Sequence, residues 1–286
     1  MRVFLIIISL VIIASSCSEN RVIKLDTIKY ELPWVDSFAV QNTIINRVVV
    51  PDNFVRIEAV KNTFAHWLRR LPLKEGKPLV TLYNNKSKSN QSAHAFVLDL
   101  DVGEKDLQQC ADAAIRLRAE YLFNNDKIDS IHFNYTNGAN VPFSTWSKGY
   151  FPVPGSGKVT WKNALKNDTS YASFKEYLLQ IFNYAGTLSL SKELKSIPLE
   201  QISPGDILCT GGSPGHAVMV MDVAIEETTR EKIFLLGQGG TPAQEMHIIK
   251  NPKNSRLSPW YKVSEIGNAI RTTNWVFSRS SLMRWV

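Results

Sequence analysis

The sequence predicts an α+β domain in which a helix packs on an antiparallel sheet. Residues 104–123 repeat apolar side chains at steps of three and four, which is the spacing of one buried helix face. Two apolar runs, 218–224 and 232–238, flank the polar loop 225–231, a pattern typical of an antiparallel hairpin. A further apolar run at 207–209 lies between turn residues and predicts another buried strand.

The chain before the long helix predicts short strands around a second, shorter helix. A strand is expected at 46–52. Apolar residues at helical spacing over 64–71 predict a packing helix, which Pro72 stops. The run 79–83 and the alternating run 93–102 predict two more strands. Strands therefore stand on both sides of the long helix in the sequence.

The segment between the long helix and the hairpin predicts elements of both kinds. We expect a strand at 130–135 and, after a turn, an aromatic loop rich in Pro and Gly at 146–157. A helix is expected at 171–184, where apolar residues recur at helical spacing, and a short helical piece at 191–197. The sequence contains no internal repeat.

The N-terminus has the pattern of a targeting segment. Arg2 precedes an apolar run at 3–13, which is too short to span a bilayer comfortably and ends in small residues, as signal peptides do. The small residues directly before Cys17 resemble a bacterial lipobox, where the chain is cut before a cysteine that is then acylated. The alternative is simple secretion, with Cys17 incidental.

This pattern predicts the domain organisation and the location of the protein. We expect a signal peptide at 1–16, a lipid-anchored tether at 17–30 and a single α+β domain at 31–286. The lipid on Cys17 would attach the chain to a membrane of the bacterial cell envelope, on the periplasmic or outer face.

Composition excludes several classes of protein. With 44% hydrophobic and 21% charged residues, the chain of 286 residues is an ordinary globular protein. Its net charge of +7 is not gathered into a basic run, so we expect no nucleic-acid partner. Histidines and cysteines lack the spacing of metal ligands, and nothing in the sequence indicates a cofactor.

One candidate catalytic base is His216, at the start of an expected strand. The preceding loop contains Gly211, Gly212 and Gly215, which let other groups approach closely. Pairing of the hairpin sets His216 opposite about residue 240, so that Gln238 falls diagonally across and can orient the imidazole. Glu245 is a rival for the orienting role. The alternative is a loop histidine satisfied by local hydrogen bonds.

The candidate nucleophile is Cys110, which lies within the first two turns of the long helix. A helix N-terminus favours a thiolate, and several hydrolases present their nucleophile after a strand and a glycine in this way. A cysteine on an apolar helix face is, however, often part of the core. A disulfide between Cys110 and Cys209 is a third possibility in an oxidising compartment.

Aromatic residues in the loop after residue 145 form a candidate binding surface. Trp146, Tyr150 and Trp161 stand close together in the sequence and could line a groove for a sugar or a peptide. The alternative is a surface loop held down by its own aromatic side chains.

Four stretches resemble a known family. They are Asp-Leu-Gln-Gln-Cys-Ala-Asp from Asp106, Pro-Gly-His-Ala-Val from Pro214, Pro-Ala-Gln-Glu from Pro242 and Leu-Ser-Pro-Trp-Tyr from Leu257. Together they resemble an uncharacterised bacterial lipoprotein family that is catalogued as a domain of unknown function. The resemblance runs from about residue 50 to the C-terminus and implies a single domain without an established activity.

A weaker resemblance is to the NlpC-type papain-like cysteine peptidases and amidases. Cys110, the Gly205-Asp206 turn, His216 and Gln238 match the order of that family's nucleophile, turn, base and third polar residue. The resemblance implies a papain-like helix packed on an antiparallel sheet, here with insertions between Cys110 and His216. The nucleophile follows two glutamines in this chain, whereas in that family it usually follows Asp.

Together these features predict a cell-envelope lipoprotein with a Cys-His hydrolase site. Cys110 would attack an amide of cell-wall peptide or another envelope substrate, with His216 as the base and Gln238 as the orienting residue. The side chain of Gln108 or Gln109 would stabilise the oxyanion together with the Cys110 backbone N–H. The alternative is a lipoprotein without catalytic activity that binds a glycan or a protein partner through the aromatic loop.

Overall fold

The computed structural model describes residues 32–286. The signal peptide expected at 1–16, Cys17 and the tether at 17–30 lie outside the described residues. Within residues 32–286, no helix combines the length and the apolar character needed to span a bilayer.

The α-helices are α1 (Ile44–Arg47), α2 (Phe64–Leu68), α3 (Cys110–Asn124), α4 (Phe143–Trp146), α5 (Tyr171–Tyr184) and α6 (Thr187–Glu193). The strands are β1 (Phe54–Arg56), β2 (His94–Val97), β3 (His132–Asn134), β4 (Asn140–Pro142), β5 (Tyr150–Pro154), β6 (Val159–Asn163), β7 (Lys195–Ser196), β8 (Ile207–Thr210), β9 (His216–Glu226), β10 (Lys232–Gln238), β11 (His247–Ile249), β12 (Tyr261–Lys262), β13 (Ala269–Arg271), β14 (Val276–Ser278) and β15 (Leu282–Arg284). The α-helices end with α6, and strands β7 to β15 follow without an α-helix between them, a segregation typical of an α+β fold.

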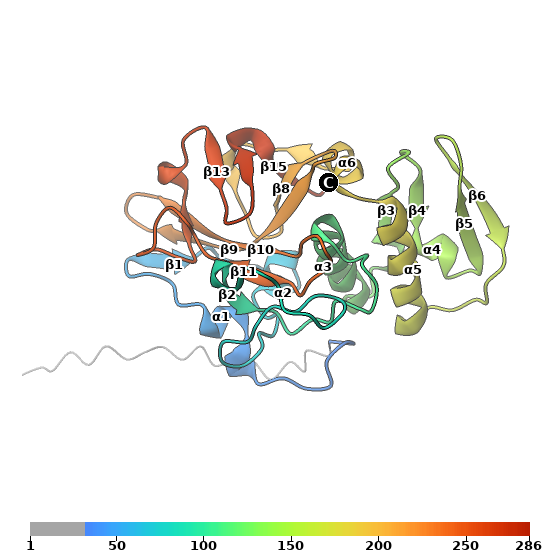
Figure 1. Ribbon diagram of the computed structural model, residues 1–286, viewed down its shortest axis with the longest axis horizontal. Helices are drawn as coiled ribbons and strands as arrows, with labels where there is room; N and C mark the ends of the chain where they lie inside the picture. Colours follow the sequence, from blue (N-terminus) through green and yellow to red (C-terminus); the bar gives the residue numbers. More distant parts are fainter. Residues whose placement is uncertain (1–31) are drawn as a thin grey trace, which may run out of the picture. The chain divides into compact units, whose positions relative to one another are not determined.

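The fold is built around one antiparallel sheet of nine strands (Figure 1). Its main path runs β2-β11-β10-β9-β8-β15-β7, while β1 pairs with β9 and β12 pairs with β10. Helix α3 packs against β9 and β10. The predicted α+β class and the helix on an antiparallel sheet are therefore confirmed.

The two faces of the sheet differ in what covers them. Gly239, just after β10, faces α3, since a Cβ built there would lie 2.9 Å from the Cβ of Ala113. Phe234 and Leu236 of β10 belong instead to the large apolar core on the other face, together with residues of β13 and β14. Because strand side chains alternate between faces, Gln238 lies in phase with Leu236 and points away from α3.

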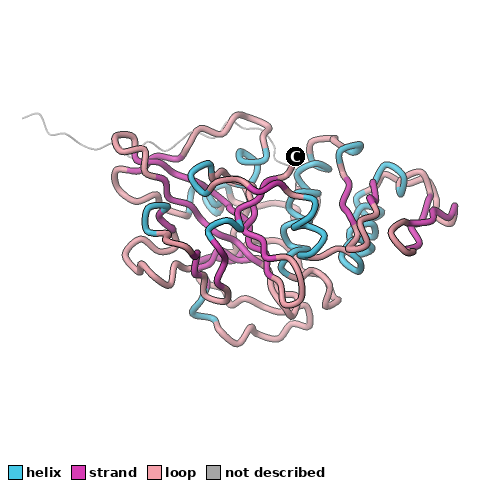
Figure 2. Tube along the Cα trace, turned by 90° about the horizontal axis from the view of Figure 1, so that it is seen from above, coloured by secondary structure: helices cyan, strands magenta, loops and turns pink. Residues whose placement is uncertain are grey.

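The chain between α3 and β8 adds a group of small elements beside the sheet. It contains the hairpins β3–β4 and β5–β6 and the helices α4, α5 and α6. Hairpin β5–β6 lies at one end of the molecule's long axis, and the view from above shows the same separation (Figures 1 and 2). In the sequence, all of these elements lie between Cys110 and His216.

Several expected strands are shorter or absent. The strand at 46–52 is wrong, because the N–H groups of Arg47 and Val48 bond back to Thr43 and Ile44 and close the helical turn of α1. The expected strand at 79–83 forms only isolated bridges. Of 93–102, only β2 pairs regularly, with β11.

Candidate functional site

Cys110 is the first residue of α3, six residues later than the start predicted for that helix. The helix begins here because the Gln109 N–H donates to Asp112 Oδ2 at 3.1 Å, and the Ala113 N–H donates to the Gln109 carbonyl at 2.9 Å. An acidic side chain that accepts a hydrogen bond from the N-cap N–H is a favoured N-terminal signal. Residues 104–109, which carry no such cap, form turns instead.

Cys110 lies in the wall of a polar cavity of about 760 Å³, here called the main cavity. The start of α3 forms one side. The turn before α6 and the loop at 212–215 form the others. Gly215 lets the loop approach α6, because a Cβ there would lie 2.3 Å from Thr187 Oγ1. Only 8% of the Cys110 surface is exposed.

The Cys110 thiol is neutral in this environment. Burial raises its pKa above the ordinary value of 9.0. A hydrogen bond from the backbone of Ala217 lowers the pKa, and the nearby carboxyl of Asp112 raises it further. The thiol therefore has the character of a buried core cysteine, and not that of a thiolate activated by a helix N-terminus.

His216 is oriented by a chain of hydrogen bonds that runs through Gln238 and His247 to the Glu245 carbonyl. Only one assignment of donors and acceptors lets every bond in this chain form. His247 Nδ1 lies 2.8 Å from the Glu245 carbonyl and must donate to it. Burial lowers the pKa of His247 to about 3, so its Nε2 is an acceptor, to which Gln238 Nε2 donates at 3.4 Å. Gln238 Oε1 then accepts from His216 Nε2 at 3.1 Å.

The tautomer of His216 follows from this chain. Since its Nε2 carries the proton, Nδ1 bears the lone pair. Burial lowers the pKa of His216, while the bond to Gln238 acts in the opposite direction, so the ring is neutral near pH 7. The expected pairing of His216 with Gln238 is present. Glu245 contributes only its backbone carbonyl, because its carboxylate bonds to Lys74 and to the Thr81 N–H.

The side chains of Cys110 and His216 have different neighbours, although the Cys110 thiol lies beside the backbone of Ala217, the residue after His216. His216 lies on the face of Gln238, away from α3, and its ring packs against Trp275 and Phe277 with centroids 5.5 and 5.9 Å away. Cys110 belongs to α3 on the opposite face. No hydrogen bond joins the two side chains within the described residues, and His216 is not among the described residues that line the main cavity.

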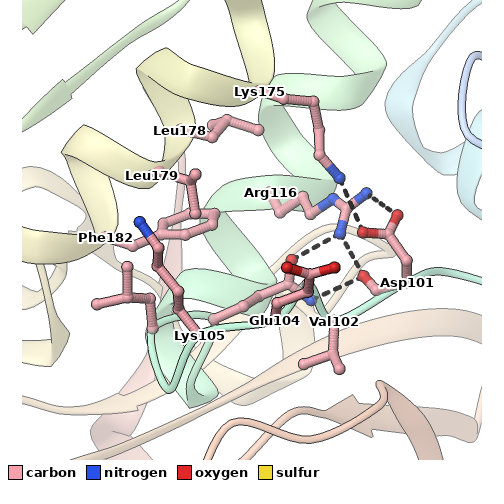
Figure 3. Close-up of a pocket in the computed structure, with 12 residues that line it drawn as sticks. Asp101, Val102, Glu104, Lys105, Arg116, Lys175, Leu178, Leu179 and Phe182 are labelled. Atoms are coloured by element: carbon pink, nitrogen blue, oxygen red, sulfur yellow. Dashed lines mark hydrogen bonds and ion pairs between the residues drawn. The ribbon is translucent and has the colours of Figure 1, made fainter. Parts of the chain in front are cut away.

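The two glutamines before Cys110 have different surroundings. Gln109 lines the main cavity, where its side chain donates to Asp106 Oδ1 and accepts from Thr241 Oγ1. Gln108 is buried and turned away from the main cavity. It lines a second, smaller space of about 260 Å³, here called the side cavity (Figure 3).

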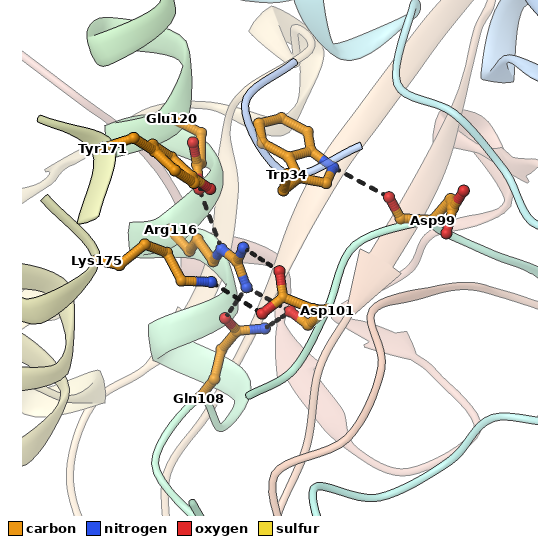
Figure 4. A network of polar contacts seen from close by, with 8 residues as sticks. All are labelled: Trp34, Asp99, Asp101, Gln108, Arg116, Glu120, Tyr171 and Lys175. Carbon is orange, nitrogen blue, oxygen red and sulfur yellow. Dashed lines mark hydrogen bonds and ion pairs between the residues drawn. The ribbon is translucent and has the colours of Figure 1, made fainter. Parts of the chain in front are cut away.

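A charged network, drawn in Figure 4, contributes Asp101, Arg116 and Lys175 to the wall of the side cavity. Arg116 is 1% exposed and donates to Gln108 Oε1 and Asp101 Oδ1, both at 2.7 Å, and to Glu120 at 3.3 Å. Lys175 Nζ contacts the other Asp101 oxygen at 2.8 Å. Asp101 is thus paired with both cations, whereas Glu120 Oε2 is buried without a hydrogen-bond partner in the described residues.

The three aromatic candidates separate in the structure. Trp146 is buried at the end of α4, where its indole N–H donates to Ser173 Oγ at 3.1 Å, so it belongs to the packing of the insertion. Tyr150 on β5 is 38% exposed, and Trp161 on β6 is half-buried. Neither Tyr150 nor Trp161 is among the described residues lining the main cavity.

Neither a disulfide nor a metal site is found among the described residues. Cys110 and Cys209 are both free and buried, so no disulfide joins them. Burial raises the pKa of Cys209 to about 12. Among residues 32–286, no group of three or more His, Cys, Asp and Glu side chains is arranged to hold a metal ion.

Comparison with known proteins places the chain in a family. Residues 44–284 match the family described as "Domain of unknown function (4846)". The chain belongs to this family. The expected resemblance to an uncharacterised family is thus confirmed, over nearly the whole of the described domain. No curated protein and no solved structure matches the chain.

Two residues of this region were not singled out as site residues by sequence reasoning. His247 fixes Gln238, and its position opposite Gln238 on β11 depends on a strand pair that the sequence did not indicate. Asp112 lies in the wall of the main cavity, and its Oδ1 is buried without a hydrogen-bond partner in the described residues. The only sequence signal for Asp112 is its place three residues after the helix cap.

Proposed function

We propose that this chain is a lipid-anchored protein of the cell envelope that binds an acidic glycan through hairpin β5–β6. The observation that carries the proposal is that the exposed Tyr150 and the half-buried Trp161 are diagonal neighbours on one face of that hairpin. The location rests on the signal-peptide pattern and on Cys17 as the site of acylation.

The register of the hairpin supports a common aromatic platform. Trp161 pairs with Pro152, which is two residues from Tyr150, so all three side chains leave the hairpin on the same side. Diagonal neighbours across a strand pair lie within reach of aromatic side chains. Tyrosine and tryptophan offer a flat apolar ring with a polar edge, which suits the apolar face and hydroxyl rim of a sugar.

The charge of the hairpin favours an acidic ligand. Between residues 148 and 166 there are four lysines and no acidic residue, and the lysines are exposed. They are Lys148, Lys158, Lys162 and Lys166. Carboxylate or phosphate groups on a glycan would meet positive potential on approach from this side.

A second candidate is the amide hydrolase with a papain-like, NlpC-type site, supported by the place of Cys110 at the start of α3 in the cavity wall. In that reaction the Cys110 proton passes to His216 Nδ1, the sulfur attacks the amide carbon, and the amine leaves with that proton. Water then cleaves the thioester. The opposite orientation of His216 is why we place this candidate second.

One experiment separates the two candidates. The full chain with Cys17→Ser, which prevents acylation, is titrated with soluble peptidoglycan glycan strands and with a neutral glucan. We expect the acidic strands to bind and Trp161→Ala to weaken binding about tenfold, since an aromatic contact contributes roughly 0.5–1.5 kcal/mol or more. Tyr184→Ala, which removes another exposed tyrosine outside the hairpin, is the matched control.

The same preparation tests for hydrolysis by mass spectrometry of peptidoglycan fragments. Cleavage that is lost in Cys110→Ala and kept in Cys209→Ala would favour the hydrolase, because the two variants remove equally buried thiols. Binding that does not change in Trp161→Ala would contradict the glycan platform.

A further inference from the structure

The side cavity has apolar walls that no other part of the described chain covers. Its walls include Leu178 and Leu179 from α5, with Phe182 one turn further on (Figure 3). Val102 and Leu107 from the loop before α3 face them. Leu179, Val102 and Leu107 are each only half-buried, so apolar surface remains available to a ligand.

The polar groups of this cavity do not call for a charged ligand. Arg116, Asp101 and Lys175 in its wall are paired with one another. At the rim, Glu104 and Lys105 carry opposite charges. A carboxylate or an ammonium group entering the cavity would lose water without gaining a free partner among the three wall residues, which is costly.

The side cavity adjoins the main cavity. Leu107 and Phe182 line both spaces, so these two side chains form the boundary between them. The main cavity is nearly three times larger in volume and more polar than the side cavity, with amide and hydroxyl groups from Gln109, Asn183 and Thr187 in its wall. A single ligand can therefore place an apolar group in one space and a chain of polar groups in the other.

From this arrangement we propose that the two cavities together bind a peptide, with its backbone in the main cavity and one apolar side chain in the side cavity. Backbone N–H and C=O groups match the amides and hydroxyls of the main cavity. The side cavity, at about 260 Å³, has room for a side chain of the size of Leu or Phe. A glycan has no such apolar branch, so this site differs from hairpin β5–β6 in both place and ligand.

The test uses capped pentapeptides, acetyl-Gly-Gly-Xaa-Gly-Gly-amide, in which Xaa is Leu, Phe, Gly, Asp or Lys. They are titrated by calorimetry against the full chain carrying Cys17→Ser and Cys110→Ala, so that no cleavage consumes the probe. We expect the Leu and Phe peptides to bind at least about tenfold more tightly than the Gly, Asp and Lys peptides, because burial of such a side chain favours binding by that order.

Variants in the wall of the side cavity test whether the preference for the Leu and Phe peptides arises in that cavity. Leu179→Asp places a charge in the half-buried wall and should abolish the preference for Leu. Val102→Trp should do the same by filling the space, which keeps the test valid if one variant fails to fold. Leu79→Asp makes the same chemical change at a residue that is 55% exposed and lines neither cavity, and it should leave the preference intact.

Each outcome bears on the proposal. Equal binding of all five peptides, no binding of any, or a Leu preference that persists in both wall variants would overturn it. Cleavage of the peptides by the chain with intact Cys110 would add the hydrolase activity to this site. Binding without cleavage would support the peptide site and contradict the hydrolase candidate.

Discussion

At the scale of single residues, Asp112 departs furthest from the ordinary behaviour of its type. Burial raises the pKa of its carboxyl to about 8, although hydrogen bonds from the Gln109 and Asp112 backbone act in the opposite direction. In the unfolded chain this carboxyl ionises near pH 4. Between these two values the unfolded chain is ionised at this position and the folded chain is not, so stability falls as the pH rises.

Asp112→Asn should remove this dependence on pH. The amide keeps an oxygen to accept from the Gln109 N–H but cannot ionise. We expect the variant and the wild type to unfold at similar denaturant concentration at pH 4. At pH 8 the variant should be more stable by an amount on the order of a few kcal/mol. Urea unfolding at both pH values measures this, and a constant difference between them would contradict a raised pKa.

At the scale of elements, sequence reasoning succeeded where the pattern was local. Helix α5 spans Tyr171–Tyr184 as predicted, because its apolar spacing is long and regular. The hairpin formed by β9 and β10 also has the predicted register near its open end, where Met219 pairs with Gly237. Continued outward, this register sets His216 opposite residue 240.

The candidate site was less predictable than the helices. Its geometry depends on which face of the sheet each side chain points to, and this is set by the pairing of all the strands. The sequence placed His216 and Gln238 side by side correctly, since both lie on one hairpin. It gave no information on which face of that hairpin receives α3. In the structure Gly239 faces the start of α3, and His216, which is out of phase with Gly239 across the hairpin, points to the other face.

The contact between Gly239 and α3 gives a prediction at the same scale. In Gly239→Ala the new Cβ would meet the Ala113 Cβ at 2.9 Å and the Gln109 carbonyl at 3.0 Å, both closer than side chains normally approach. Neither neighbour is a flexible side-chain end. We expect a loss of about 1–3 kcal/mol in the free energy of unfolding. Gly267→Ala, where nothing lies within 4 Å, should change stability by much less.

At the scale of the whole molecule, the buried Asp222 connects segments that are far apart in the sequence. Its carboxylate accepts from Arg69 after α2 at 2.6 Å and from Arg56 on β1 at 2.7 Å. Asp222 itself lies on the long strand β9 and is fully buried. The segment from Arg56 to Arg69 is thus held to the central sheet by charge as well as by apolar packing.

Removing this carboxylate should destabilise the whole described unit. Asp222→Asn leaves two guanidinium groups without their counter-charge, of which Arg69 is nearly buried, and such a loss typically costs about 3–5 kcal/mol. Glu200→Gln is the matched control, because its ion pair with Arg279 lies at the surface and should contribute little to stability. Urea unfolding of both variants compares the two losses. Similar small losses in both would mean that apolar packing alone holds the N-terminal segment to the sheet.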